Sequence, residues 1–392
     1  MHRNDKQRFS GFSLIELMVA MALGLIILGA ASQAFKAGMT TSSLVSNRAE
    51  MQQNTRAALD LISKDISMAG AGLPPAGLQL PTGSGSTLSK VACNQLGQCY
   101  LNNQNYAIGT VATAPTSTVS NYMYGVLPGS NNGMEKVGAT SISGTIPAMA
   151  SSGIIPDSIT VAYVDFAPQL NLFKGSFTDA TGTVLNLAPP IPFPAGVTPA
   201  SDPAAGIKVG DLLLVATSIG SCVGEVTSVA PYLTNGATVT FASYDVLNIN
   251  QPTAAAGNMK GIVSPGSYPG PWVAASPSVS AQRLQVISYF LEVPAVGTPR
   301  LMRQVNGATA QPVADNIIDL QFSYDLCDSG NTGGTCATTQ DPIAISQSPS
   351  QIHKVNIKVL GQSLVTNGKD SQNMQLTSAV STRNLSFKDR YQ

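Results

Sequence analysis

The feature that most constrains this chain is a long apolar segment near its amino terminus, from Phe12 to Phe35, with a single carboxylate at Glu16. A helix of about two dozen residues, at a rise of about 1.5 Å each, spans the ~30 Å hydrocarbon core of a bilayer. An acidic side chain inside such a segment costs about 2.5–3.5 kcal/mol, so it usually faces a protein partner and not lipid. We therefore expect Glu16 to work in contact with another protein.

The residues before this segment indicate its orientation. Residues 1–11 carry Arg3, Lys6 and Arg8 against the single acid Asp5. Basic residues just before an apolar run are retained on the cytoplasmic side. We expect one pass through the inner membrane, with a cytoplasmic amino terminus and with the residues after Phe35 translocated. A cleavable signal peptide ending near Ala31, and a plain anchor for a periplasmic protein of unknown activity, are the simpler alternatives.

The run Gly11-Phe12-Ser13-Leu14-Ile15-Glu16-Leu17 resembles the class III signal of type IV pilins and type II secretion pseudopilins. The resemblance implies that prepilin peptidase cleaves between Gly11 and Phe12 and that Phe12 becomes the N-methylated first residue. Glu16 is then the fifth residue of the mature chain, with a role in assembly. Its carboxylate would neutralise the α-ammonium of a neighbouring subunit and set the register between subunits, since an unpaired charge is costly at low dielectric.

Residues 36–70 continue the apolar segment as an amphipathic helix. Apolar and small residues recur there at spacings of three, four or seven, which is helical periodicity. Glycines at Gly70 and Gly72, followed by Pro74 and Pro75, predict the end of the helix. The two halves together predict one helix of about 58 residues, about 87 Å long.

Beyond residue 70 the sequence predicts a mostly antiparallel β region with long loops. Several runs alternate at period two, as in sheets with one solvated face. The predicted strands are Ser158–Val164, Leu212–Ala216, Val223–Val229, Thr238–Phe241, Leu284–Val293, Leu301–Val305, Ile317–Leu326, Ile352–Leu360 and Gln375–Ser381. The predicted fold class is α+β, a long amino-terminal helix packed on this β region.

Four regions follow from these patterns. Residues 1–11 form a cytoplasmic leader, 12–35 a membrane and assembly helix, 36–70 its amphipathic continuation, and 71–392 a periplasmic or extracellular β region. Loop-rich stretches at 76–156 and 185–205 are candidate insertions.

The order of the late strands resembles that of PilW-like minor pilins, and the shorter GspJ-type pseudopilins share its last part. The resemblance is carried by Ser288-Tyr289-Phe290, Leu301-Met302-Arg303, residues 313–324, residues 355–359 and Thr382-Arg383-Asn384-Leu385. It implies a minor pilin that helps prime pilus assembly at or near the pilus tip. It also implies contacts with other minor pilins, the major pilin and a large tip adhesin, and a role in twitching motility or adhesion. A pseudopilin of a type II secretion system is the alternative.

Five cysteines in an exported chain raise the question of disulfides. Pairing between neighbours, Cys93 with Cys99 and Cys327 with Cys336, is preferred, although other pairings remain open. A link that closes a loop of ~10 residues stabilises the fold by about 2.5–3 kcal/mol in the chain-entropy model. Cys222 is then left as a buried thiol.

The residue types needed for catalysis are scarce. The chain has two histidines, His2 in the leader and His353 in a predicted strand, and no Cys/His set has zinc spacing. No phosphate-binding loop or nucleophile elbow is present, so we expect no enzymatic activity, no cofactor and no metal. Because 21 basic residues balance 21 acidic ones without an exported basic cluster, we predict no nucleic-acid partner.

Overall fold

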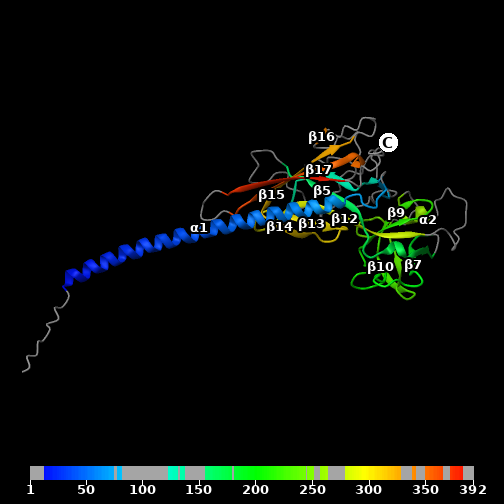
Figure 1. Cartoon of the computed structure of the whole chain (residues 1–392), viewed down its shortest axis with the longest axis horizontal. Coiled ribbons are helices and arrows are strands. Elements are labelled where there is room, and N and C mark those ends of the chain that lie inside the picture. Colours follow the sequence, from blue (N-terminus) through cyan, green and yellow to red (C-terminus); the bar gives the residue numbers. More distant parts are fainter. Residues whose placement is uncertain are drawn as a thin grey trace, which may run out of the picture.

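The computed structural model describes residues 13–74, 77–81, 122–130, 133–136, 155–178, 181–243, 245–250, 257–263, 279–327, 338–340, 349–364 and 371–382. One long helix, α1 (Leu14–Met68), precedes strands that form one eight-stranded, two four-stranded and one two-stranded sheet. About half of α1 projects from the β region as a rod (Figure 1). The predicted α+β fold, a long amino-terminal helix packed against antiparallel sheets, is confirmed.

Local sequence determines both ends of α1. Ser13 is extended (φ −69°, ψ 143°) and precedes the first helical residue, and the acidic Glu16 lies in the first turn. A negative charge there complements the partial positive charge of a helix amino terminus. At the other end Gly70 and Gly72 have φ values of 79° and 72°, and a Cβ on Gly72 would lie 2.7 Å from Cβ of Val164. Glycine is therefore required where the chain turns from α1 toward the sheet.

The eight-stranded sheet is organised around β12 (Ser280–Val293). One side of β12 pairs with β8 and β13, and the other side with β5 and β4; all these pairs are antiparallel except that with β4. The outer strands are β3, β4, β9 and β14. The bounds are β3 (Val126–Gly129), β4 (Met134–Lys136), β5 (Ser158–Asp165), β8 (Leu212–Ala216), β9 (Ser221–Glu225), β13 (Arg300–Val305) and β14 (Gln311–Asp315).

A four-stranded antiparallel sheet lies beside α1, in the order β16-β15-β17-β18. Its strands are β15 (Ile317–Leu326), β16 (Thr338–Gln340), β17 (Ile352–Gln362) and β18 (Asn373–Ser381). The helix packs along β17 and β18. A short 3-10 helix, η2 (Pro349–Gln351), leads into β17.

The remaining sheet forms a lobe at the end of the molecule away from the projecting half of α1 (Figure 1). Its order is β10-β11-β7-β6, and it has a hydrophobic cluster of its own. The elements of this lobe are β6 (Lys174–Phe177), β7 (Val184–Ala188), β10 (Ser228–Tyr232), β11 (Gly236–Thr240), α2 (Met259–Val263) and η1 (Leu170–Leu172). The two-stranded sheet pairs β1 (Leu78–Gln79) with β2 (Tyr122–Met123).

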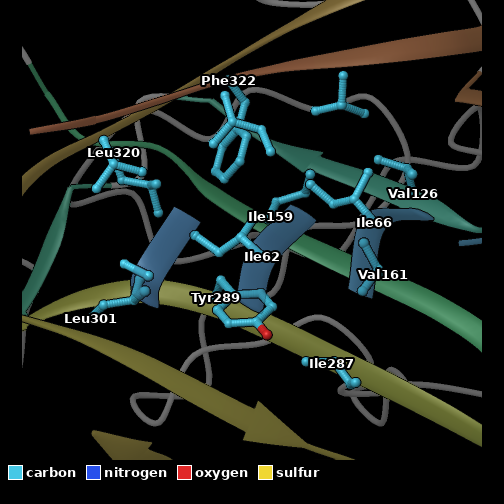
Figure 2. Packing of buried hydrophobic residues seen from close by; sticks show 14 of the residues in the cluster. Ile62, Ile66, Val126, Ile159, Val161, Ile287, Tyr289, Leu301, Leu320 and Phe322 are labelled. Atoms are coloured by element: carbon cyan, nitrogen blue, oxygen red, sulfur yellow. The ribbon is translucent and has the colours of Figure 1, made fainter. Parts of the chain in front are cut away.

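The carboxyl-terminal half of α1 lies in a core shared by the two sheets that contain β12 and β15. Figure 2 shows Ile62 and Ile66 of α1 among Ile159, Tyr289 and Phe322, and all five are fully buried or nearly so. Burial of one such aliphatic side chain contributes about 1.5–3 kcal/mol. This half of the helix is therefore an integral part of the β region's core.

Most predicted strands correspond to observed ones, and β8 and β15 have the predicted bounds. The predicted strand Val223–Val229 is wrong as a single element, because β9 ends at Glu225 and β10 begins at Ser228. Between them the chain leaves one sheet for another: Val226 N–H donates to Asp211 O and Thr227 N–H to Thr240 O. Short strands such as β3, β6 and β7 were not predicted, and residues 185–205 begin within β7.

Candidate assembly site

The projecting half of α1 is apolar and uncovered. Among the described residues, α1 contains a stretch long and apolar enough to cross a membrane, and no residue of that stretch is buried within the protein. Exposed side chains lie on all sides of it, including Leu14 at 76 % and Phe35 at 71 %. A helix that is apolar all round is normally buried in a membrane or among other helices. This surface is therefore the strongest candidate for contact with lipid and with other subunits.

Glu16 lies at the exposed start of this surface. Farther along the helix, a Cβ added at Gly24, Gly29 or Gly38 would meet nothing within 4 Å. Small residues at uncovered positions let the backbone of another helix approach closely. Gly11 and Phe12 lie outside the described residues, so the cleavage and N-methylation sites stay predictions, as does the role of Glu16.

A buried polar cluster fixes α1 to the β region. The hydroxyl of Tyr289 donates to Oδ2 of Asp65 at 2.6 Å, and the guanidinium of Arg303 donates to the same oxygen through Nε and Nη2, both at 3.0 Å. Asp65 is only 3 % exposed. The carboxylate on the helix is thus held by side chains of β12 and β13, and its charge is paired.

The electrostatics of this cluster extend to two tyrosines. Burial, and then the negative charge of Asp65, raise the pKa of Tyr163 to about 12. Burial and the hydrogen bond to Asp65 also raise the pKa of Tyr289 well above its ordinary value. Both phenols therefore remain neutral over the physiological range, and Tyr289 keeps its role as hydrogen-bond donor.

Asp65 joins α1 to the β region through Tyr289 and Arg303, and the sequence did not predict this contact. The observed stripe toward the sheets contains Met51, Thr55, Ala58, Ile62 and Ile66. Asp65 falls on this stripe, three residues after Ile62. Its position on the helical wheel was the available signal, but the identity of its partners was not readable from the sequence.

A close contact brings the middle of α1 against β17. Gly361 lies so near the helix that a Cβ there would be 2.2 Å from Oγ1 of Thr55, a side chain that is itself fully buried. On the adjoining segment, Nε of Arg48 donates to Oε1 of Gln372. These contacts hold the rod against the sheet from the buried core out to β18.

The cysteines are only partly described. Cys327 follows β15, is buried and is disulfide-bonded. Its predicted partner Cys336, and the predicted pair Cys93 and Cys99, lie outside the described residues, so both pairings stay predictions. Cys222 is a free thiol, fully buried, with its pKa raised by burial.

Charged groups elsewhere do not form a metal-binding set in the described part of the chain: no group of three or more His, Cys, Asp or Glu lies together there. Glu225 is a buried acid whose Oε2 accepts the N–H of Leu247 at 3.0 Å. Burial, with a further contribution from Asp245, raises the pKa of Glu225 to about 7. The neighbouring Asp245 accepts the N–H groups of Ile249 and Asn250 and so organises the 245–250 loop.

A family model described as the prokaryotic N-terminal methylation motif matches residues 6–32. The chain thus carries the amino-terminal methylation motif of type IV pilins and pseudopilins, and the match covers this motif alone. The motif implies processing by prepilin peptidase, and the apolar helix is consistent with a membrane-anchored pilin precursor. No curated protein and no solved structure matches the chain.

Proposed function

We propose that this protein is a minor pilin of a type IV pilus, similar to PilW-like minor pilins, that helps prime pilus assembly and lies at or near the pilus tip. The observation that carries the proposal is α1 itself. One half is apolar, exposed and carries Glu16, while the other half is built into the core of a large β region. This combination suits a subunit whose helix is packed in a filament and whose β region faces outward.

The proposed mechanism begins in the inner membrane. Prepilin peptidase cleaves after Gly11, and Phe12 becomes the N-methylated amino terminus. The new α-ammonium of one subunit pairs with Glu16 of its neighbour, which fixes the axial position of the two helices. Because Asp65 is held by Tyr289 and Arg303, the axial position of the helix also determines the position of the β region. That region contacts other minor pilins, the major pilin and a large tip adhesin, in support of motility and adhesion.

Processing is tested by mass spectrometry of the protein extracted from the membrane of a piliated cell. We expect a mature chain that begins at Phe12 and carries one added methyl group. A chain that keeps residues 1–11, or one cleaved after Ala31, would show that the protein is not processed as a pilin.

The role of Glu16 is tested by Glu16→Ala, with Glu50→Ala as the matched control, since Glu50 is an exposed acid on the same helix beyond its apolar half. We expect Glu16→Ala to insert into the membrane normally but to be absent from sheared pili. We expect Glu50→Ala to be incorporated like the wild type. Equal incorporation of the two variants would remove the assembly role from Glu16.

A type II secretion pseudopilin would give a different result in the same cells. Deletion of the gene would then leave pili unchanged and would block secretion of folded proteins. Loss of pili, with secretion intact, is the outcome that the pilus proposal requires.

A further inference from the structure

The edge strands of this protein differ in their protection against pairing with other chains. The edge strands β3, β10 and β14 contain Pro128, Pro231 and Pro312. The strands β4, β6 and β16 are only three or four residues long. The outer strand β9 is five residues long, and its last N–H, at Glu225, is bonded to Oδ1 of Asn250. Prolines and short lengths are devices that prevent edge-to-edge association of sheets.

The edge strand β18 has none of these devices. It is nine residues long, the longest edge strand in the described part of the chain, and its sequence, NMQLTSAVS, has no charge and no proline. It pairs with β17 from Asn373 to Ser381 without a bulge. A long, regular and uncharged edge is a template for addition of another strand.

The register between β17 and β18 shows which backbone N–H and C=O groups of β18 point away from β17. Thr382 N–H donates to His353 O, and Ser363 N–H donates to Gln372 O. Antiparallel pairs alternate between bonded and non-bonded residues, so the even-numbered residues of β18 bond to β17. The odd-numbered residues direct N–H and C=O away from β17: Asn373, Gln375, Thr377, Ala379 and Ser381. Within the described residues these groups have no hydrogen-bond partner, and the first four residues are exposed.

The charged side chains of β17 next to β18 leave no free charge for a partner strand to match. The nearest charged side chains of β17 are already paired across the sheet, Lys354 with Asp325 at 2.5 Å and Lys358 with Asp319 at 3.8 Å. A strand added at β18 therefore meets no unpaired charge from these neighbours. Its affinity would come from main-chain hydrogen bonds and from shape.

The position of α1 indicates where such a strand would come from. The helix runs along β17 and β18 (Figure 1), and Arg48 of α1 bonds to Gln372 just before β18. A subunit whose helix packs beside α1 would bring its own β region next to this edge.

A second copy of this chain fits the edge poorly. Antiparallel pairing of two β18 strands about a two-fold axis would point the two α1 helices in opposite directions. Copies with parallel helices would instead bring β18 against the opposite edge, β16, which is three residues long. The edge therefore suits a different subunit that has a longer free strand.

We propose that β18 is a docking edge that receives an extended, uncharged strand from a different pilin subunit and thereby lengthens the sheet β16-β15-β17-β18 by one strand. The inference rests on the proposed function, because a helix packed beside α1 is what brings the partner to β18.

The test places a photoreactive amino acid at Ala379 of the full-length chain in piliated cells, with Gln311 in the proline-containing edge β14 as the matched control site. We expect Ala379 to crosslink to one other protein that itself carries an N-terminal methylation motif, through a strand of that protein. Thr377→Pro removes one outward N–H without breaking a bond to β17 and should reduce this crosslink about fivefold, whereas Thr377→Val should retain it.

Amide hydrogen exchange gives a readout that does not depend on any variant. The amides of Gln375, Thr377 and Ala379 should exchange at least about tenfold more slowly in the assembled complex than in the purified chain. Equal crosslinking at Ala379 and Gln311, a product formed with a second copy or with a protein that is not a pilin, or unprotected amides in the complex would each overturn the proposal.

Methylation of Phe12 is measured in the same samples. A methylated, incorporated chain without these signals rejects the docking edge alone, whereas an unprocessed chain rejects the proposed function.

Discussion

At the residue scale, the attachment of α1 depends on Asp65. Its carboxylate is buried and is satisfied by Tyr289 and Arg303, which belong to strands more than 200 residues away in the chain. Removal of one member of a buried charge pair leaves the other member without compensation. The energetic cost of losing Asp65 is therefore larger than that of losing an exposed acid.

We predict that Asp65→Ala lowers the free energy of unfolding of the detergent-solubilised chain by about 3 kcal/mol. Asp60→Ala, at an exposed position of the same helix, should change it by less than about 0.5 kcal/mol. Urea titration followed by circular dichroism measures both. Equal effects of the two substitutions would mean that the buried cluster does not hold the helix.

Glu225 provides a second prediction at this scale, which concerns pH. Burial raises the pKa of Glu225 from 4.5 to about 7, so the folded state holds its proton more tightly than the unfolded state. The stabilisation that this group contributes to the folded state is fully present below pH 4.5 and is lost as pH rises to about 7.

Glu225→Gln removes this titration while it keeps a side chain of similar size. The difference in unfolding free energy between wild type and Glu225→Gln should therefore shift in favour of the variant as pH rises from 4.5 to 7. A difference that stays constant over this range would argue against a protonated Glu225 in the folded protein.

At the scale of elements, the contact between α1 and β17 depends on the absence of a side chain at Gly361. A Cβ there would overlap Oγ1 of Thr55, at 2.2 Å, and would crowd Cγ of Met51, at 3.3 Å. Because Thr55 is buried, it has no free space to move into without a shift of α1.

We predict that Gly361→Ala destabilises the protein by about 1–3 kcal/mol. Thr55→Ala removes the overlapping oxygen. The double variant should therefore lose less unfolding free energy than the sum of the losses caused by the two single substitutions. Gly220→Ala is the control, because its nearest neighbour would be 3.7 Å away. Strict additivity of Gly361→Ala and Thr55→Ala would contradict the contact.

At the scale of the whole molecule, the two halves of α1 have separate tasks. The apolar half contributes nothing to the core, since the membrane-length stretch has no buried residue, whereas the buried residues of α1 begin at Met51. Removal of the first half should therefore abolish membrane association and leave the fold intact.

We predict that residues 41–392, exported behind a cleavable signal peptide, are soluble. Their free energy of unfolding, extrapolated to zero urea, should equal that of the full chain to within about 10–15 %, the usual uncertainty of the extrapolation. Centrifugation and urea titration measure the two properties. A truncated chain that fails to fold would show that the projecting half is needed for more than anchoring and assembly.

Much of this architecture could be predicted from local pattern. The apolar run with Glu16, the stop at Gly70 and Gly72, and alternating strands such as Ile317–Leu326 depend on hydropathy and backbone preferences within a few residues. These features determined the fold class, the long helix and the resemblance of the amino terminus to type IV pilins.

Other features arise only when distant segments meet. The sequence could not show that Asp65 pairs with Tyr289 and Arg303, that Gly361 touches Thr55, or that β18 is an open edge. Each depends on contacts between residues far apart in the chain, and hydrophobic periodicity states which face is buried but not what covers it. The sequence by itself determined that this chain begins with a long helix whose first half is apolar; the tertiary structure decided how that helix is held and which edge strand lies open beside it.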